Sequence, residues 1–332
     1  MDIVISHKSA LEYWRGWRAH DIALDKQRIR QRVRKAPEKL QPPSFNQKEI
    51  LSSLSLPIDV LVASEGARRP SQWFYPHIFR GTVPDNGFVS VEDEIFVCSP
   101  ELVFLQLGNV LSLLELIETG YELCGRFAIV SSEEKQDDVA SDRPEPDATA
   151  QSKLIECQQL TSVAKLKAFI ERMPGQKGRS RCLRALRYIA DDSASPMEIK
   201  LAMLLCLPYK LGGYGLPLPE LNYHVYPGKA VRGSLDRSFY SCDLYWPEHK
   251  LAVEYDSDQF HSATEHIASD SRKRTALAML GVDVVTVTRT QVRSFVQLEN
   301  VAKVLAAKMG RQLRMKIPKF SQTRHKLRSQ LL

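Results

Sequence analysis

The stretch that decides the fold of the C-terminal half is KLAVEYDSDQFH, residues 250–261. It begins with Leu251–Val253, which are small or branched apolar residues typical of a buried β-strand. Three carboxylates and an imidazole follow within a few residues: Glu254, Asp256, Asp258 and His261. Buried carboxylates are costly unless a positive group compensates them. The sequence therefore indicates a strand that ends at a charged site, where the compensating group is a metal ion, an arginine or only water.

The flanking residues predict an α/β domain around this strand. SPMEIKLAMLLCL (195–207) is apolar almost all round, which favours a buried helix. The remaining patterns predict strands at 221–227, 238–247, 250–256 and 282–288, and helices at 268–281 and 290–309. The order from residue 195 is αβββαβα, which describes an α/β sheet with helices on its faces.

This order resembles the PD-(D/E)xK nuclease superfamily, and CDLYWPEHKLAVEYDSDQFH and DSRKRTALAMLGVDVVTVT carry the resemblance. These lines are most similar to the branch around the very-short-patch-repair (Vsr-like) endonucleases and their uncharacterised bacterial relatives. That pattern has an aspartate on one strand, an acid ending the next, then a histidine and an Asp-x-x-x-Arg helix that leads through a glycine into the last strand. The matching positions are Asp243, Glu254 with Asp256, His261, Asp270 with Arg274, and Gly281. The resemblance spans residues 195–290 and implies a restriction-endonuclease-like αβββαβ core.

The resemblance also implies a catalytic metal site. Mg²⁺ prefers oxygen ligands and keeps several of its waters, so one or two carboxylates suffice. Asp243 and Glu254 are eleven residues apart across a predicted hairpin, and strands about 5 Å apart bring side chains of one face together. Asp256 shares the face of Glu254 by the period of two. We expect Asp243, Glu254 and Asp256 to hold Mg²⁺ or Mn²⁺, with His261 as general base or acid.

One position departs from the family pattern. The lysine that gives the superfamily its name is expected two residues after Glu254, and Asp256 stands there instead. The positive charge that such a lysine supplies is then expected from Lys250 or from the Arg272–Arg274 group, with His261 taking over proton transfer.

Glu198 is a further catalytic candidate, since superfamily members often place an acid on the helix before the first strand. Ser195-Pro196-Met197-Glu198 is also a good capping box, with Ser195 as N-cap and Glu198 three residues on. The two roles are equally supported and compatible. For Asp270 and Arg274 we favour an i,i+4 ion pair on a solvated helix face, with Arg274 as a candidate phosphate contact.

Basic residues point to an anionic partner. The formal net charge is +7, and residues 308–332 contain eight Lys or Arg and no Asp or Glu. Such runs contact phosphates without sequence preference, although a solvated terminus explains the tail equally well. The candidate nucleic-acid contacts are Arg272, Lys273, Arg274, Arg324, Lys326 and Arg328.

The chain is long enough for two domains. We expect a mixed α/β regulator-like or recognition domain at 1–130, an acidic polar linker at 131–152, the endonuclease-like domain at 153–310 and the basic tail at 311–332. Two helices are also expected, one spanning 99–120 with Ser99 as N-cap and another within 153–172.

Six scattered cysteines form no CxxC pair, so we interpret them as reduced and mostly buried thiols of a cytoplasmic protein. The N-terminus lacks a signal-peptide pattern, and the most apolar run, 102–117, is too short and polar to span a membrane. No membrane partner is expected.

Two functions remain open from these observations. The leading hypothesis is a metal-dependent endonuclease that hydrolyses DNA, with DNA favoured over RNA and a role in bacterial defence or toxin–antitoxin biology. The N-terminal domain would recognise the substrate or a protein partner. The alternative is a non-catalytic nucleic-acid-binding regulator that retains a nuclease fold, and Asp256 in place of lysine is its best support.

Overall fold

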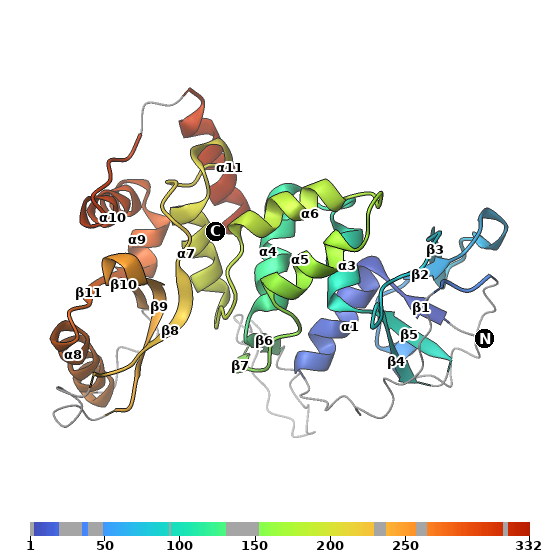
Figure 1. Cartoon of the computed structure of the whole chain (residues 1–332), viewed down its shortest axis with the longest axis horizontal. Coiled ribbons are helices and arrows are strands. Elements are labelled where there is room, and N and C mark those ends of the chain that lie inside the picture. Colours follow the sequence, from blue (N-terminus) through green and yellow to red (C-terminus); the bar gives the residue numbers. More distant parts are fainter. Residues whose placement is uncertain are drawn as a thin grey trace, which may run out of the picture. The chain divides into compact units, whose positions relative to one another are not determined.

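The computed structural model describes residues 3–19, 35–38, 49–92, 94–130, 153–228, 237–256, 264–314 and 318–332. They form two units (Figure 1), which we call the N-terminal unit (within 1–112 and 126–183) and the C-terminal unit (within 113–125 and 184–332). Helices and mixed sheets in both units confirm the predicted α/β class.

The units do not divide where the sequence suggested. Strand β7 (Lys153–Glu156) pairs antiparallel with β6 (Phe127–Val130), so the residues after 152 return to the N-terminal unit. The predicted helix within 153–172 is correspondingly shorter, because β7 takes its start and α5 begins at Val163. The proposed linker at 131–152 lies outside the described residues.

The N-terminal unit is built on a five-stranded mixed sheet of order β3-β2-β1-β5-β4. Strand β1 is central and pairs parallel with β5 and antiparallel with β2. The strands are β1 (Ile3–Ile5), β2 (Ile58–Val62), β3 (Phe74–Ile78), β4 (Phe88–Glu92) and β5 (Ile95–Cys98). The helices are α1 (His7–Ala19), α2 (Glu49–Ser52), α3 (Pro100–Leu107), α5 (Val163–Glu171) and α6 (Arg179–Ala185).

The single helix expected at 99–120 is two helices. Ser99 caps α3 as predicted, because its side chain accepts a hydrogen bond from the Leu102 amide. The chain breaks after Gly108, and α4 (Leu113–Cys124) continues in the C-terminal unit. A Cβ on Gly108 would lie 2.2 Å from Cys182 Sγ, so close packing of α6 against this turn requires the glycine.

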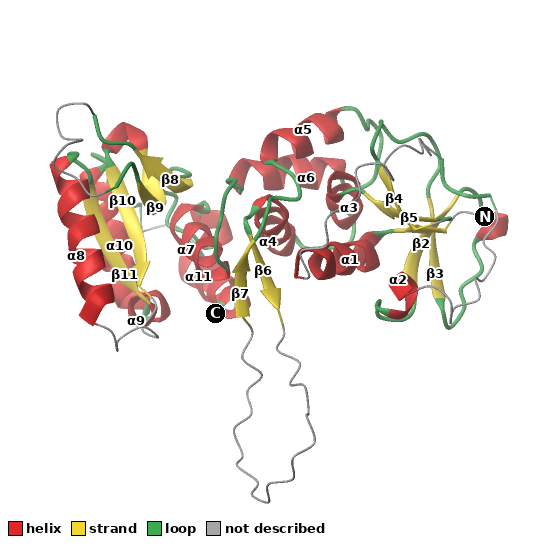
Figure 2. Cartoon of the chain, turned by 90° about the horizontal axis from the view of Figure 1, so that it is seen from below, coloured by secondary structure: helices red, strands yellow, loops and turns green. Residues whose placement is uncertain are grey.

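The C-terminal unit contains a four-stranded sheet of order β11-β10-β9-β8. Its strands are β8 (Glu220–Val225), β9 (Tyr240–Trp246), β10 (Leu251–Asp256) and β11 (Asp283–Thr288). Its helices besides α4 are α7 (Pro196–Cys206), α8 (Thr264–Met279), α9 (Arg289–Arg293), α10 (Phe295–Lys308) and α11 (Phe320–Leu331). The predicted order αβββαβα from residue 195 is confirmed, and Figure 2 shows the sheet between α7 and α8.

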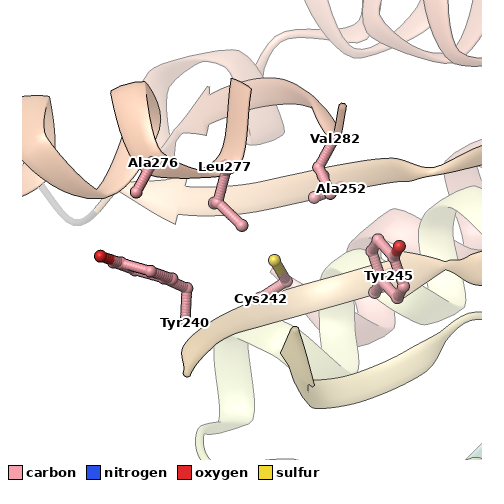
Figure 3. Packing of buried hydrophobic residues seen from close by; sticks show 7 residues of the cluster. All are labelled: Tyr240, Cys242, Tyr245, Ala252, Ala276, Leu277 and Val282. Carbon is pink, nitrogen blue, oxygen red and sulfur yellow. The ribbon is translucent and has the colours of Figure 1, made fainter. Parts of the chain in front are cut away.

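The face of the sheet toward α8 is packed by apolar side chains (Figure 3). Ala276 and Leu277 of α8 close over Tyr240, Cys242 and Tyr245 of β9. Val282 and Ala252 complete the cluster. This packing fixes the register of α8 against β9 and β10, and therefore decides which α8 side chains reach the ends of these strands.

The end of the basic tail is part of the fold. In α11, Phe320, Leu327 and Leu331 are buried against the C-terminal unit. Gly212, at φ +94°, lets the backbone approach closely, because a Cβ there would lie 2.4 Å from the Thr323 carbonyl oxygen. The interpretation of this segment as a solvated terminus is therefore wrong for 320–331. Among the described residues, no helix is long and apolar enough to cross a membrane.

Candidate active site

The site begins where strands β9 and β10 separate. Their ladder runs from the pair Leu251–Trp246 to the pair Val253–Leu244. One step further, the Tyr255 amide donates a 2.8 Å hydrogen bond to Asp243 Oδ2 instead of continuing the ladder. Glu254 lies opposite Asp243 in this register, so the two carboxylates meet at the fork, as the spacing of eleven residues predicted.

Glu254 is held by a lysine from α8. Lys273 Nζ lies 2.5 Å from Glu254 Oε2, and the two side chains are 24% and 17% exposed. Glu254 Oε1 is buried, and no described N–H or O–H group donates a hydrogen bond to it, although the Cys242 thiol interacts with this carboxylate. A buried carboxylate oxygen without a partner is costly, so this oxygen is available to a ligand.

Burial and mutual repulsion keep these carboxylates from ionising easily. Burial raises the pKa of Glu254 to about 7, Asp243 adds to the rise, and the Lys273 ammonium opposes it. Burial also raises the pKa of Asp243, against the lowering effects of the Tyr255 amide and Lys273. For Lys273, burial lowers the pKa but the Glu254 and Asp243 carboxylates outweigh it, so the net direction is upward. One ammonium therefore faces two carboxylates, and their full ionisation leaves an excess negative charge.

Glu198 extends this group from the N-terminus of α7. Ser195 caps the helix by accepting from the Glu198 amide at 3.2 Å, which confirms the predicted N-cap. The reciprocal bond of the predicted capping box comes from the Ala194 amide instead of the Ser195 amide. The Glu198 carboxylate accepts from the Ala194 amide at 2.9 Å and from Asn222 Nδ2 at 2.6 Å. Burial and the Asp243 carboxylate raise the pKa of Glu198 to about 6. Glu198 thus anchors the start of α7, and its raised pKa reflects its burial and the nearby Asp243 carboxylate.

Two members of the site were not foreseen. Asn222 adopts φ +47°, a conformation that asparagine tolerates better than most residues, and its side chain turns to Glu198. Cys242 is buried beside Glu254, and burial raises the pKa of its thiol to about 12, with Glu254 adding to the rise. A lone Asn or Cys within a strand pattern gives no signal from which either role could be read.

Asp256 does not join the group. Its side chain is exposed at the end of β10, and among the described residues no three His, Cys, Asp or Glu side chains are placed to hold a metal ion. The described residues therefore do not bring Asp256 into one group with Asp243 and Glu254, and these two remain the candidate ligands. His261, the predicted proton-transfer residue, lies outside the described residues.

The basic candidates divide by helix face. Arg272 and Arg274 are exposed on α8, while Lys273 between them turns inward to Glu254. Lys326 is exposed on α11. Arg272, Arg274 and Lys326 keep side chains that a nucleic acid could reach.

Arg324 and Arg328 are used within the fold, which corrects their prediction as phosphate contacts. Arg324 donates to Glu299 Oε2 at 2.8 Å and lies over the ring of Phe320. Arg328 is buried, and its Nη2 donates to the carbonyls of Val292 and Arg293. A guanidinium that makes such contacts holds α11 in place and is directed into the fold.

The site fits a divalent cation in part. Two hard carboxylate groups meet at one point, one buried oxygen lacks a partner, and their repulsion calls for positive charge. Lys273 already supplies one charge, so the pair needs one more cation and offers few ligands. Such a set matches Mg²⁺ or Mn²⁺, which keep most of their own waters.

A stability measurement tests this electrostatic arrangement without any substrate. The pKa of Glu254 is about 7, above its ordinary 4.5, so its contribution to folding is full below pH 4.5 and is lost as pH rises through 7. In EDTA, Asp243→Asn is expected to raise the free energy of unfolding at pH 8 by about 1–2 kcal/mol and to change little at pH 5. Urea denaturation at both pH values measures it.

The matched control is Asp256→Asn, which removes an exposed carboxylate two residues from Glu254 and should leave both values unchanged. Mg²⁺ should stabilise the unsubstituted protein more at pH 8 than at pH 5. Equal stability of Asp243→Asn and the unsubstituted protein at pH 8 would show that the carboxylates do not repel each other.

Comparison with known proteins yields only relatives without an assigned role. No family model and no solved structure matches the chain. Two uncharacterised proteins from two strains of Mycobacterium tuberculosis are each 31% identical to it over 125 residues, which is 36% of this chain. The match covers 40% of the length of these relatives. The chain is thus similar in one part to uncharacterised mycobacterial proteins.

Proposed function

We propose that the chain is a metal-dependent endonuclease that hydrolyses phosphodiester bonds of DNA. One observation carries the proposal: two half-buried carboxylates, Asp243 and Glu254, converge where two strands separate, with a buried Glu254 Oε1 that lacks a partner and a lysine beside them. Two carboxylates that share one lysine keep an excess negative charge when both are ionised, which a second cation would compensate. The resemblance to the PD-(D/E)xK nucleases supports the same reading.

Asp243 and Glu254 would hold Mg²⁺ or Mn²⁺, which when bound neutralises phosphate charge and lowers the pKa of a coordinated water. The Tyr255 amide and Lys273 fix the direction of the two carboxylates. Lys273 Nζ has three N–H donors, one of which goes to Glu254, so it can also contact a phosphate oxygen or a water. In this proposal Lys273 supplies the charge that the motif lysine would give in place of Asp256.

Incubation of the purified protein with supercoiled plasmid and with linear DNA, in EDTA, Mg²⁺ or Mn²⁺, tests the proposal. Cleavage is expected only with a metal. Glu254→Gln, which preserves the shape of the side chain, should lower it by about 1,000-fold. Asp270→Asn, which alters an exposed carboxylate of α8, serves as the control and should cleave normally. Cleavage that survives Glu254→Gln would place the chemistry elsewhere.

The second candidate is a DNA-binding regulator that retains the fold without turnover. The absence of a three-residue metal group among the described residues and the exposed Asp256 favour it. It predicts salt-sensitive DNA binding that ignores Mg²⁺, the same in the unsubstituted protein and in Glu254→Gln. Cleavage of RNA but not DNA in the same assay would keep the site and change the substrate. The N-terminal unit would recognise the substrate or a protein partner in either case.

A further inference from the structure

Three aromatic rings gather at the end of the β8–β9 hairpin where the connecting loop leaves and re-enters the strands. His224 stacks on Phe239 with ring centroids 4.0 Å apart, and Tyr226 lies 5.9 Å from Phe239. Tyr226 is 66% exposed and Phe239 is 38% exposed. We call these three residues the aromatic platform. Neighbouring aromatic rings that are exposed to water indicate a binding surface.

The platform is not part of the core that packs the sheet. Tyr223 and Val225 of β8 pack against the α8-facing cluster of Figure 3. His224 lies between them in the strand, so its side chain points to the opposite face. The pairing of His224 with Ser241 places Phe239 next to it across the ladder. The rings therefore extend away from the apolar cluster toward solvent.

The platform lies on the strands that carry the site. His224 is two residues beyond Asn222, and Phe239 is four residues before Asp243. At 3.3–3.4 Å per residue these separations are about 7 Å and 13 Å along the strands. The aromatic platform and the carboxylates therefore belong to the same two strands and are a short distance apart along them.

The surroundings suit an anionic ligand. Arg237, two residues before Phe239, is exposed and contacts Ser269 of α8. Aromatic faces beside basic side chains are the usual means by which proteins bind single-stranded nucleic acid, because every base has a face that can stack. Bases within a duplex are already stacked on each other and cannot use such a platform.

We propose that His224, Tyr226 and Phe239 stack the unpaired bases of single-stranded nucleic acid, so that a single strand or an unpaired segment is the substrate presented to the carboxylate site. This inference rests on the proposed function for its account of cleavage, whereas the stacking itself does not require a metal.

Binding of a fluorescein-labelled dT20 oligonucleotide to the full chain in EDTA, followed by fluorescence anisotropy, tests the platform. The double variant Tyr226→Ala, Phe239→Ala is expected to weaken binding about tenfold or more. Tyr226→Phe keeps a ring at the same place and should bind like the unsubstituted protein. An oligonucleotide with 2-aminopurine at successive positions should lose fluorescence on binding to the unsubstituted protein and keep it with the double variant.

Each result decides the inference. Equal dT20 binding by the unsubstituted protein and the double variant overturns it. So does a double variant that loses as much affinity for a blunt duplex as it loses for dT20. Thermal melting of the double variant separates misfolding from lost stacking. If the double variant is misfolded, Tyr226→Ser alone is measured with the 2-aminopurine oligonucleotide, and that result decides. Ring-dependent binding without metal-dependent cleavage would retain the platform and remove the nuclease. Cleavage of single strands without ring dependence would do the reverse.

Discussion

Replacing Lys273 with methionine is expected to lower the proposed metal-dependent cleavage about 100-fold or more and to move its pH dependence upward. Lys273 is the cation that contacts Glu254, and it opposes the rise in the pKa of both Glu254 and Asp243. Without it, the pKa of Glu254 rises further above about 7, so a higher pH is needed to ionise the pair. Loss of one charged donor at a reacting phosphate typically costs a factor of 100 to 1,000.

Cleavage rates between pH 6 and 9.5 with saturating Mg²⁺ measure this effect. Lys273→Arg preserves the charge and should keep the pH profile nearer the original, while Arg274→Met alters an exposed cation one residue on and should leave the pH profile unchanged. A readout without activity is the free energy of unfolding at pH 8, where Lys273→Met leaves a buried carboxylate unpaired. A uniform loss of rate at all pH values would mean that Lys273 does not act on the carboxylates.

Replacing Arg328 with alanine is expected to destabilise the C-terminal unit by about 3 kcal/mol. Its Nη2 donates to the carbonyls of Val292 and Arg293 at the end of α9, and its guanidinium lies 4.2 Å from the ring of Phe295. The substitution leaves two acceptors without their donor and a space where α11 meets α9 and α10. Lys326→Ala, on the exposed face of the same helix, should change stability by less than about 0.5 kcal/mol.

Urea denaturation measures both variants, and the salt dependence of DNA binding supplies the opposing test. Were Arg328 a phosphate contact, Arg328→Ala would lower the slope of log affinity against log salt by about one and leave stability unchanged. Lys326→Ala is the variant for which that result is expected, if α11 contacts nucleic acid at all.

The elements of the C-terminal unit were readable from the sequence because each carried its own local signal. The helix at 195 had a cap and an apolar run, and the strands had branched apolar residues bounded by turns. The break after Gly108 was hidden because the glycine is required by Cys182, which lies far along the chain. Strand β7 was missed because its pairing with β6 spans a polar segment.

The candidate site also has features that local sequence patterns predict and features that they do not. The meeting of Asp243 and Glu254 follows from hairpin spacing, which the sequence contains. The inward turn of Lys273, between two exposed arginines, depends on how α8 packs over Tyr240 and Cys242, which no local pattern states. Asp256 lies on the same side of β10 as Glu254 by the period of two, but this period does not tell that the Asp256 side chain is exposed at the last residue of β10, where the strand still pairs with β11 and no longer with β9.

The fork at Asp243 gives the protein a built-in reporter of occupancy. Asp243 Oδ2 is the acceptor for the Tyr255 amide at the point where the ladder ends. A cation that binds this carboxylate withdraws electron density from Oδ2 and weakens its hydrogen bond to the Tyr255 amide. Amide hydrogen exchange at Tyr255 therefore reports on the carboxylate site, and its change on titration with Mg²⁺ would register binding without any substrate.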